Sequence, residues 1–309
     1  MKKVFIFILL ASFLLWGNTA CQPAPSASPQ TPSSLKVLAV ETFLADITRQ
    51  VAGDRLSVEA LLPIGLDPHA FEPTPQDVAR IADSQVLIIN GAGFETWLEK
   101  VLQNAGGQRL VIEASAGLTP RQPQPGEPAT DEHETDPHFW LDPTLVIHYV
   151  ETIRDGLSQA DPSGKEVYTA NAAAYIDQLR ALDAWIQEQV NAIPPERRIL
   201  VTNHESFGYF ADRYGFRILG TLLPSVSTGA SPSAMELASL ADHIRQSGAP
   251  AIFLETGASP QLAEQISRET GVKVVSGLFT HSITAPDGPA PSYLAMMRYN
   301  VTAIVAALR

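Results

Sequence analysis

Four histidines are the residues of this sequence best suited to chemistry, because each lies beside a turn-forming or strand-ending residue. Two of them follow the dipeptide Asp-Pro, and the other two come shortly after apolar runs. Neutral imidazole is the commonest nitrogen ligand of zinc, and four imidazoles can complete a tetrahedral shell around Zn2+. We interpret the four as one metal site, which the fold must assemble. They are His69, His138, His204 and His281.

The elements that position these side chains alternate between short apolar runs and segments of helical spacing. This alternation predicts an α/β fold with two similar β/α lobes and mostly parallel sheets. In the first lobe we expect strands at 35–40, 57–62, 86–90 and 110–112, and helices at 43–52, 75–84 and 94–102. In the second we expect strands at 199–201, 217–219, 251–254 and 273–275, and helices at 207–214, 233–247 and 259–270.

The longest helical pattern lies between the two lobes. Apolar residues recur at helical spacing from Lys165 to Val190, and Pro194 and Pro195 end the pattern. At 1.5 Å per residue the helix spans about 39 Å, which is long enough to run past both lobes. We therefore predict one rigid linking helix, which limits hinge motion and favours a metal site of fixed geometry in the cleft.

The expected strands place the four histidines at one edge of the two sheets. His69 and His138 enter from loops rich in proline, whereas His204 and His281 follow strands. Ligands of open α/β sheets bind outside the carboxyl ends of the strands. All four histidines are therefore expected to face one interlobe cleft, two from each lobe.

The first residues have the layout of a secretory leader. Lys2 and Lys3 precede an apolar run at 4–16, which is too short to span a bilayer comfortably. Cys21 is the only cysteine, and it sits where a bacterial lipoprotein leader places the residue that carries the lipid. Asn18 departs from that pattern, which usually has an aliphatic residue three positions before the cysteine.

The domain organisation follows from these segments. Residues 22–34 are rich in Pro, Ser, Ala, Gln and Thr, which is the composition of a flexible tether. We predict a leader at 1–20, a lipid-anchored tether at 21–34, an N-terminal β/α lobe at 35–160, the linking helix at 161–195 and a C-terminal β/α lobe at 196–309. The net charge of −12 argues against nucleic acid as a partner and weakly favours the handling of cations.

Five long motifs carry a resemblance to a known family. The sequence resembles the metal-binding solute-binding proteins of bacterial zinc- and manganese-type ABC transporters, known as cluster A-I. The stretches that carry the resemblance are GLDPHAFEPTP at 65–75, DPHFWLDP at 136–143, HESFGYF at 204–210, FTHS at 279–282 and YLAMMRYN at 293–300.

The resemblance implies a two-lobed carrier that is not an enzyme. Such a protein binds a divalent metal with high affinity in the periplasm or at the outer face of the cytoplasmic membrane, and delivers it to an ABC permease. The family's metal ligands fall at His69, His138, His204 and His281. We expect a monomer, held at the membrane through a lipid on Cys21.

One departure from the family bears on the metal. The fourth ligand of the family is usually an aspartate, and its manganese carriers usually have a glutamate at the position of His204, whereas this chain has imidazole at both. Imidazole favours Zn2+ over the harder Mn2+. We therefore predict Zn2+, with a Mn2+ or Fe2+ carrier of the same family as the alternative.

Other readings stay open beside the carrier. A secreted metallohydrolase needs a zinc with an open coordination position, which exists only if His281 is not a ligand. An adhesin with a structural metal is a further alternative.

Glu205 is a candidate for orienting an imidazole through its second nitrogen. The segment 131–134 is a short acidic and histidine-containing loop that could collect metal weakly, although a solvated loop is favoured.

Overall fold

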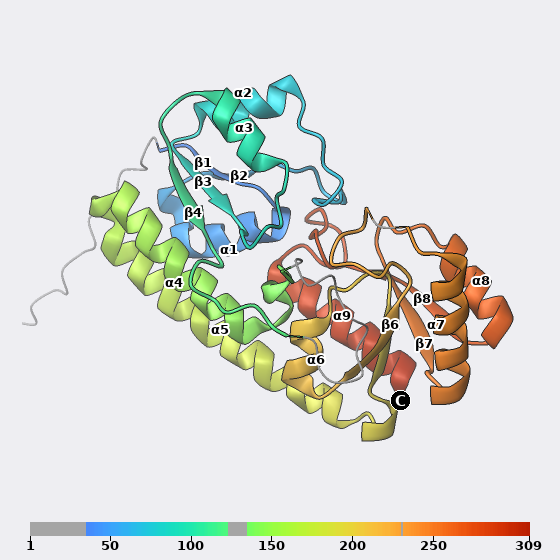
Figure 1. Ribbon diagram of the computed structural model, residues 1–309. Coiled ribbons are helices and arrows are strands. Elements are labelled where there is room, and N and C mark those ends of the chain that lie inside the picture. The colour runs from blue at the N-terminus through green and yellow to red at the C-terminus, as the bar shows by residue number, and fades with distance from the viewer. Residues whose placement is uncertain (1–34, 123–134, 230) are drawn as a thin grey trace, which may run out of the picture. The chain divides into compact units, whose positions relative to one another are not determined.

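The computed structural model describes residues 35–122, 135–229 and 231–309. The expected leader, the tether, Cys21 and the 131–134 segment lie outside the described residues. The described chain folds into two β/α lobes, each with a four-stranded sheet of parallel strands (Figure 1). This confirms the predicted fold class.

The first sheet has the strand order β2-β1-β3-β4. Alternate residues of its strands point to opposite faces, as the pleat requires. On one face Val37 and Ile88 pack against α1 and α4, and on the other Leu38 and Leu87 pack against α2 and α3. The elements are β1 (Val37–Ala39), α1 (Thr42–Ala52), β2 (Val58–Ala60), α2 (Pro75–Asp83), β3 (Val86–Ile89), α3 (Leu98–Ala105), β4 (Leu110–Glu113) and α4 (Pro143–Ala160).

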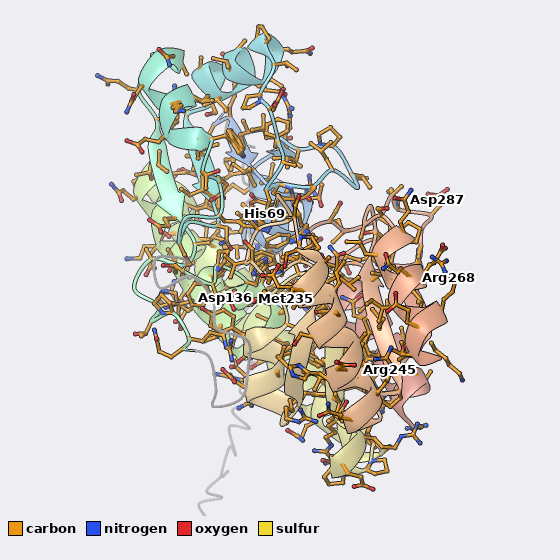
Figure 2. The ribbon with its side chains drawn as sticks, turned by 45° about the vertical axis from the view of Figure 1, so that its right-hand side comes forward. His69, Asp136, Met235, Arg245, Arg268 and Asp287 are labelled. Carbon is orange, nitrogen blue, oxygen red and sulfur yellow. The ribbon has the colours of Figure 1, made fainter. Side chains whose placement is uncertain are left out.

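The second sheet repeats the plan with the order β6-β5-β7-β8. Its outer face is covered by α7 and α8, and its inner face packs with α6 and α9. The charged side chains Arg245 and Arg268 lie on those outer helices, away from His69 (Figure 2). The elements are β5 (Ile199–Thr202), α6 (Gly208–Tyr214), β6 (Arg217–Thr221), α7 (Ala234–Ser247), β7 (Ala251–Glu255), α8 (Gln261–Thr270), β8 (Lys273–Leu278) and α9 (Tyr293–Leu308).

Local sequence explains where several helices begin. Thr74 and Ser233 each form a capping box with an acid three residues later, which satisfies free backbone N–H groups at the start of α2 and α7. One predicted start is wrong: the helix expected at 94–102 begins at Leu98. The preceding residues instead form a left-handed turn at Gly91, Ala92 and Gly93.

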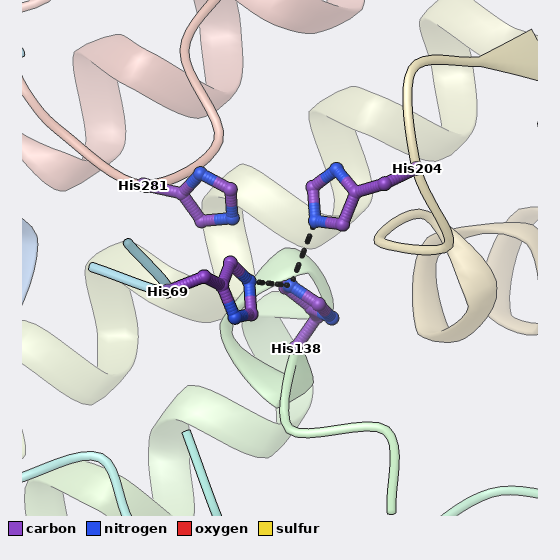
Figure 3. Close-up of side chains that lie close together, drawn as sticks. All are labelled: His69, His138, His204 and His281. Atoms are coloured by element: carbon purple, nitrogen blue, oxygen red, sulfur yellow. Dashed lines mark hydrogen bonds between the residues drawn. The ribbon is translucent and has the colours of Figure 1, made fainter. Parts of the chain in front are cut away.

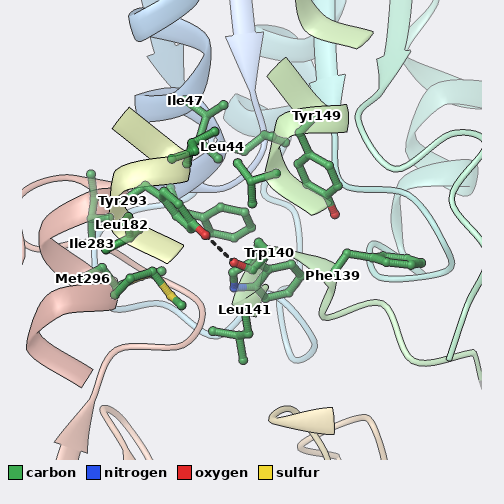
Figure 4. Packing of buried hydrophobic residues seen from close by; sticks show 14 of the residues in the cluster. Leu44, Ile47, Phe139, Trp140, Leu141, Tyr149, Leu182, Ile283, Tyr293 and Met296 are labelled. Carbon is green, nitrogen blue, oxygen red and sulfur yellow. Dashed lines mark hydrogen bonds between the residues drawn. The ribbon is translucent and has the colours of Figure 1, made fainter. Parts of the chain in front are cut away.

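The linking helix α5 (Lys165–Asn191) has 27 residues and contacts α1 and α4 as well as α6 and α9. Its buried stripe includes Tyr168, Leu179, Leu182 and Val190. Side chains of both sheets, of α5 and of α9 belong to one continuous core. Figure 4 shows part of it, in which Leu182 of α5 and Tyr293 of α9 pack near Trp140. Moving the lobes apart would expose that apolar surface to water. The shared core therefore holds the two lobes in place relative to each other.

No helix of the described ranges is long and apolar enough to cross a membrane.

Candidate metal centre

The structure brings the four predicted histidines together at one point (Figure 3). Nε2 of His138 lies 3.4 Å from Nε2 of His69 and 3.2 Å from Nε2 of His204. The ligand atoms of all four lie within 4.8 Å of one another. Zn–N bonds of 2.0–2.1 Å place tetrahedral nitrogens about 3.3 Å apart, so the two shortest separations already match that shell.

The two histidines of the first lobe are held by the same local device. The carboxylate of Asp67 accepts a hydrogen bond from the backbone N–H of His69, and that of Asp136 accepts one from the backbone N–H of His138, each over 3.0 Å. An aspartate that bonds the backbone two residues later fixes a tight turn, and the intervening proline restricts the backbone further. Each Asp-Pro-His sequence therefore aims its own imidazole.

The two histidines of the second lobe depend on the sheet instead. His204 follows β5, and His281 follows β8, so both lie at the carboxyl ends of parallel strands. The hydroxyl of Thr202 donates to the carbonyl of His204 over 2.9 Å, and the indole N–H of Trp140 donates to the carbonyl of Thr280 over 2.7 Å. The second contact ties the His281 loop to the segment that carries His138.

Two buried carboxylates face the other ring nitrogens. Nδ1 of His138 lies 2.9 Å from Asp136. The carboxylate of Glu255 lies 2.6 Å from Nδ1 of His204 and 3.5 Å from Nδ1 of His281. A hydrogen on Nδ1 that is donated to a carboxylate leaves the lone pair on Nε2, which faces the centre. These contacts therefore select the tautomer that can bind a metal.

Glu255 is a residue that the sequence interpretation missed. The expectation was that Glu205 orients an imidazole, but the partner of Nδ1 at His204 is Glu255, which lies at the end of β7. The signal that could have found it is an acid directly after an apolar buried run, at the same edge of the sheet as the histidines. His148 and His243, which we did not predict as ligands, lie on α4 and α7.

Aromatic rings enclose the centre on one side. The ring of Phe94 lies 4.8 Å from that of His69 and 4.9 Å from that of Trp140, measured between centroids. His138, His204 and His281 are buried, and a cleft of about 480 Å3 reaches the centre at His281. The remaining lining of that cleft mixes apolar side chains with polar ones, which include Asp67, Asn203, Thr228 and Ser282.

The electrostatics keep three of the four imidazoles neutral. Burial, followed by the charge of His204, lowers the pKa of His69 to about 3. Burial also lowers the pKa of His138 well below its ordinary value and that of His281 to about 3. At His204 burial acts in the same direction and is the largest single effect, but Glu255, Asp67 and Asp136 together outweigh it and raise the pKa. Three lone pairs are thus ready for a cation, and a proton on His204 must leave before it binds.

Comparison with known proteins gives the same class that the fold and the site define, a two-lobed binding protein of metal transport. A periplasmic metal-binding protein of Candidatus Liberibacter asiaticus, solved with Mn bound, superimposes with a TM-score of 0.80 at 29% identity, covering 89% of this chain and all of that one. The periplasmic zinc-binding protein TroA of Treponema pallidum gives 0.79 at 31% identity, covering 88% and 99%.

The sequence comparisons fix the family. Residues 37–307 match the family described as zinc-uptake complex component A, periplasmic, and the chain belongs to it. The manganese-binding lipoprotein MntA of Halalkalibacterium halodurans is 32% identical over 309 residues, covering all of this chain and 99% of the relative. The protein is therefore a substrate-binding component of a metal ABC transporter.

Replacing Glu255 with Gln should weaken metal binding about 10- to 100-fold, the usual effect of losing a carboxylate that orients a metal-binding histidine. The amide keeps one acceptor but loses the charge that holds His204 and His281. Competition with a chromogenic chelator measures the change. Glu205→Gln is the matched comparison: a larger loss there than at Glu255 would return the orienting role to Glu205.

The buried imidazoles should also make the metal-free protein sensitive to acid. The folded protein keeps His69 neutral down to about pH 3, whereas the unfolded chain protonates it below 6.5. Wild type should therefore lose stability relative to His69→Gln as the pH falls below 6.5, by at most about 1.4 kcal/mol per pH unit. Buried carboxyls act in the opposite sense, but they are common to both proteins and cancel in the comparison.

Urea unfolding of chelator-stripped protein between pH 7 and pH 5 gives this difference. His243→Gln, a change at an exposed position on α7, is the control and should run parallel to wild type. Parallel curves for wild type and His69→Gln would show that His69 is protonated in the folded protein as it is in the unfolded chain.

Proposed function

We propose that the protein captures a divalent transition metal outside the cytoplasm, Zn2+ in preference to Mn2+, and delivers it to an ABC permease. The proposed ligands are Nε2 of His69, His138, His204 and His281. The observation that carries the proposal is the convergence of these four ring nitrogens within 4.8 Å, with three of the rings buried and one partly buried. The cation is the cargo of the protein.

The choice of zinc rests on the chemistry of the donor atoms. All four proposed ligands are nitrogen, and the carboxylates that contact their rings, Asp136 and Glu255, lie against Nδ1 atoms. Imidazole nitrogen suits Zn2+, whereas carboxylate oxygen suits Mn2+. The relative MntA is named as manganese-binding and TroA as zinc-binding, so the family holds both kinds of carrier. A Mn2+ or Fe2+ carrier is the second candidate.

The same geometry disfavours a catalytic role. Catalytic zinc keeps a coordination position for water, and four imidazoles leave none in a tetrahedral shell. Burial of His138, His204 and His281 further restricts access for a substrate larger than an ion. We infer that the protein is not a metallohydrolase. Adhesion is kept only as a role that could accompany metal transport.

Cys21 is the proposed lipid attachment site, by which the tether at 21–34 would hold a monomeric body in the periplasm or at the outer face of the cytoplasmic membrane. Relatives such as MntA are named as lipoproteins, which supports the proposal. Cys21→Ser should move the protein from the membrane fraction to the soluble fraction of the cell envelope. An unchanged distribution between the two fractions would exclude the anchor.

Metal titration of the chelator-stripped protein tests the proposed cargo. Zn2+ should bind with one ion per chain and displace Mn2+ in competition calorimetry. His281→Asp should shift the ratio of affinities toward Mn2+ by about tenfold or more, because it exchanges a nitrogen donor for an oxygen donor. His148→Asp, placed on α4, controls for the added charge. Tighter binding of Mn2+ than of Zn2+ by the wild type would overturn the zinc assignment.

A further inference from the structure

The first lobe contains two buried carboxyl groups that the proposed function does not use. Glu41, between β1 and α1, is 0% exposed, and Glu95, in the turn after β3, is 7% exposed. No lysine or arginine among the described residues forms an ion pair with either. A buried acid without a cation must be protonated or hydrogen-bonded to persist, so the pair calls for an explanation.

Glu95 holds a strained turn. Its carboxylate accepts hydrogen bonds from the backbone N–H groups of Asn90 over 2.6 Å and of Gly91 over 3.1 Å. The next residue, Ala92, has a φ of 52°, and it is the only non-glycine residue of the described chain with a left-handed backbone. Such a conformation persists where its surroundings impose it. Glu113 adds a third hydrogen bond, from the N–H of Ala92 over 3.1 Å.

This turn reaches the metal centre at both of its ends. At one end, the ring of Phe94 lies 4.8 Å from that of His69 and 5.9 Å from that of His138. At the other end, the side-chain amide of Asn90 donates to the carbonyl of Pro137 over 3.1 Å. Pro137 directly precedes His138. A shift of the turn would therefore move two of the four proposed ligands.

Glu41 is close enough to Glu95 for the two carboxyl groups to influence each other's pKa. Both side-chain oxygens of Glu41 are buried and have no hydrogen-bond partner in the structure. Burial, followed by the charge of Glu95, raises the pKa of Glu41 well above its ordinary value. Burial also raises the pKa of Glu95 to about 7, although its bonds to the backbone favour the charged form. A proton on Glu41 would supply the missing hydrogen bond by pointing at Glu95.

The other titratable groups around the pair leave this arrangement in place. The hydroxyl of Tyr149, on α4, donates to Asn90, and burial together with the charge of Glu95 raises the pKa of that tyrosine well above its ordinary value. Glu113, on β4, is engaged by the backbone of Ala92. Glu41 is therefore the group in position to donate a hydrogen bond to Glu95.

We propose that Glu41 is a positioning residue of the metal centre, acting as the hydrogen-bond donor that fixes Glu95 and with it the turn beneath His69 and His138. Glu41 itself does not contact the ion. The inference rests on the proposed metal-binding function. It adds that two residues of the first lobe, which are not ligands themselves, fix the positions of His69 and His138.

The pair gives a signature that needs no metal. The folded protein keeps the proton of Glu41 at pH values above 4.5, where an unfolded glutamate loses it. The folded state then binds more protons than the unfolded state, so stability falls as the pH rises above 4.5. One retained proton raises the unfolding equilibrium constant about tenfold per pH unit. Glu41→Gln keeps an N–H donor that does not ionise, so the contribution of Glu41 to this slope should disappear.

The first measurement is urea unfolding of the full, chelator-stripped chain from pH 5 to pH 7. Relative to Glu41→Gln, the unfolding constant of wild type should rise about tenfold per pH unit. Glu188→Gln, at an exposed position on α5, is the matched control and should follow wild type. Parallel curves for wild type and Glu41→Gln would overturn the proposal, because they would show that Glu41 holds no proton.

The second measurement is Zn2+ affinity at pH 7, with far-ultraviolet circular dichroism to confirm the fold. Glu41→Gln should bind Zn2+ within about twofold of wild type, and Glu41→Met, which has no donor, about tenfold more weakly. Equal affinities for wild type, Gln and Met variants would overturn the positioning role. If Glu41→Met does not fold, a tenfold loss in the Gln variant, which retains the donor, overturns it instead.

A failure of the proposed function would look different. In that case wild type itself would bind no Zn2+, and the positioning role would fall with it, while the unfolding curves would still establish whether Glu41 holds a proton in the folded protein.

Discussion

Four imidazoles that share one small volume have to stay largely uncharged, and the rest of the structure follows from that constraint. Ring nitrogens only 3.2 and 3.4 Å apart cannot all carry protons, because like charges at that distance in a buried site repel strongly. Burial keeps three of the rings neutral. At His204 the carboxylate of Glu255 opposes the effect of burial and raises the pKa. The carboxylates on Nδ1 then decide which nitrogen faces inward. Three rings thus offer lone pairs aimed at one point, and His204 adds a fourth in its neutral form.

Holding lone pairs in that arrangement requires a stiff support. The linking helix α5 and the core that both sheets share provide it, since neither lobe can tilt without exposing apolar side chains. The His281 loop is also joined to the first lobe: Oγ of Ser282 lies 3.1 Å from Oγ1 of Thr42 and accepts a hydrogen bond from the N–H of Gly65. Three of the ligand segments are therefore connected by bonds that do not involve the histidines.

The architecture and the four histidines were accessible from sequence because their signals are local. Apolar runs of strand length, the helical stripe from Lys165 to Val190 and the two Asp-Pro-His turns can each be recognised in one continuous stretch of sequence. The positioning residues were not accessible in this way. Glu255 meets His204 only after two strands pair, and Glu41 meets Glu95 only after β1 and β3 lie side by side. Helix α9, which closes the core between the lobes, was matched only as a motif, because its nearly uniform apolar character hides its period.

The two Asp-Pro-His turns have a further consequence for how the protein is made. Their hydrogen bonds span only two residues, so these turns can form before the lobes do, whereas His204 and His281 are placed only by completed sheets. An unfolded chain offers at most scattered imidazoles to a metal, and the finished chain offers four converging ones. An ion held by all four would join segments that are remote in sequence, so its binding free energy would add to that of folding. Bound metal would then stabilise the fold, and proteases of the cell envelope would cleave the metal-free protein more readily than the metal-bound one.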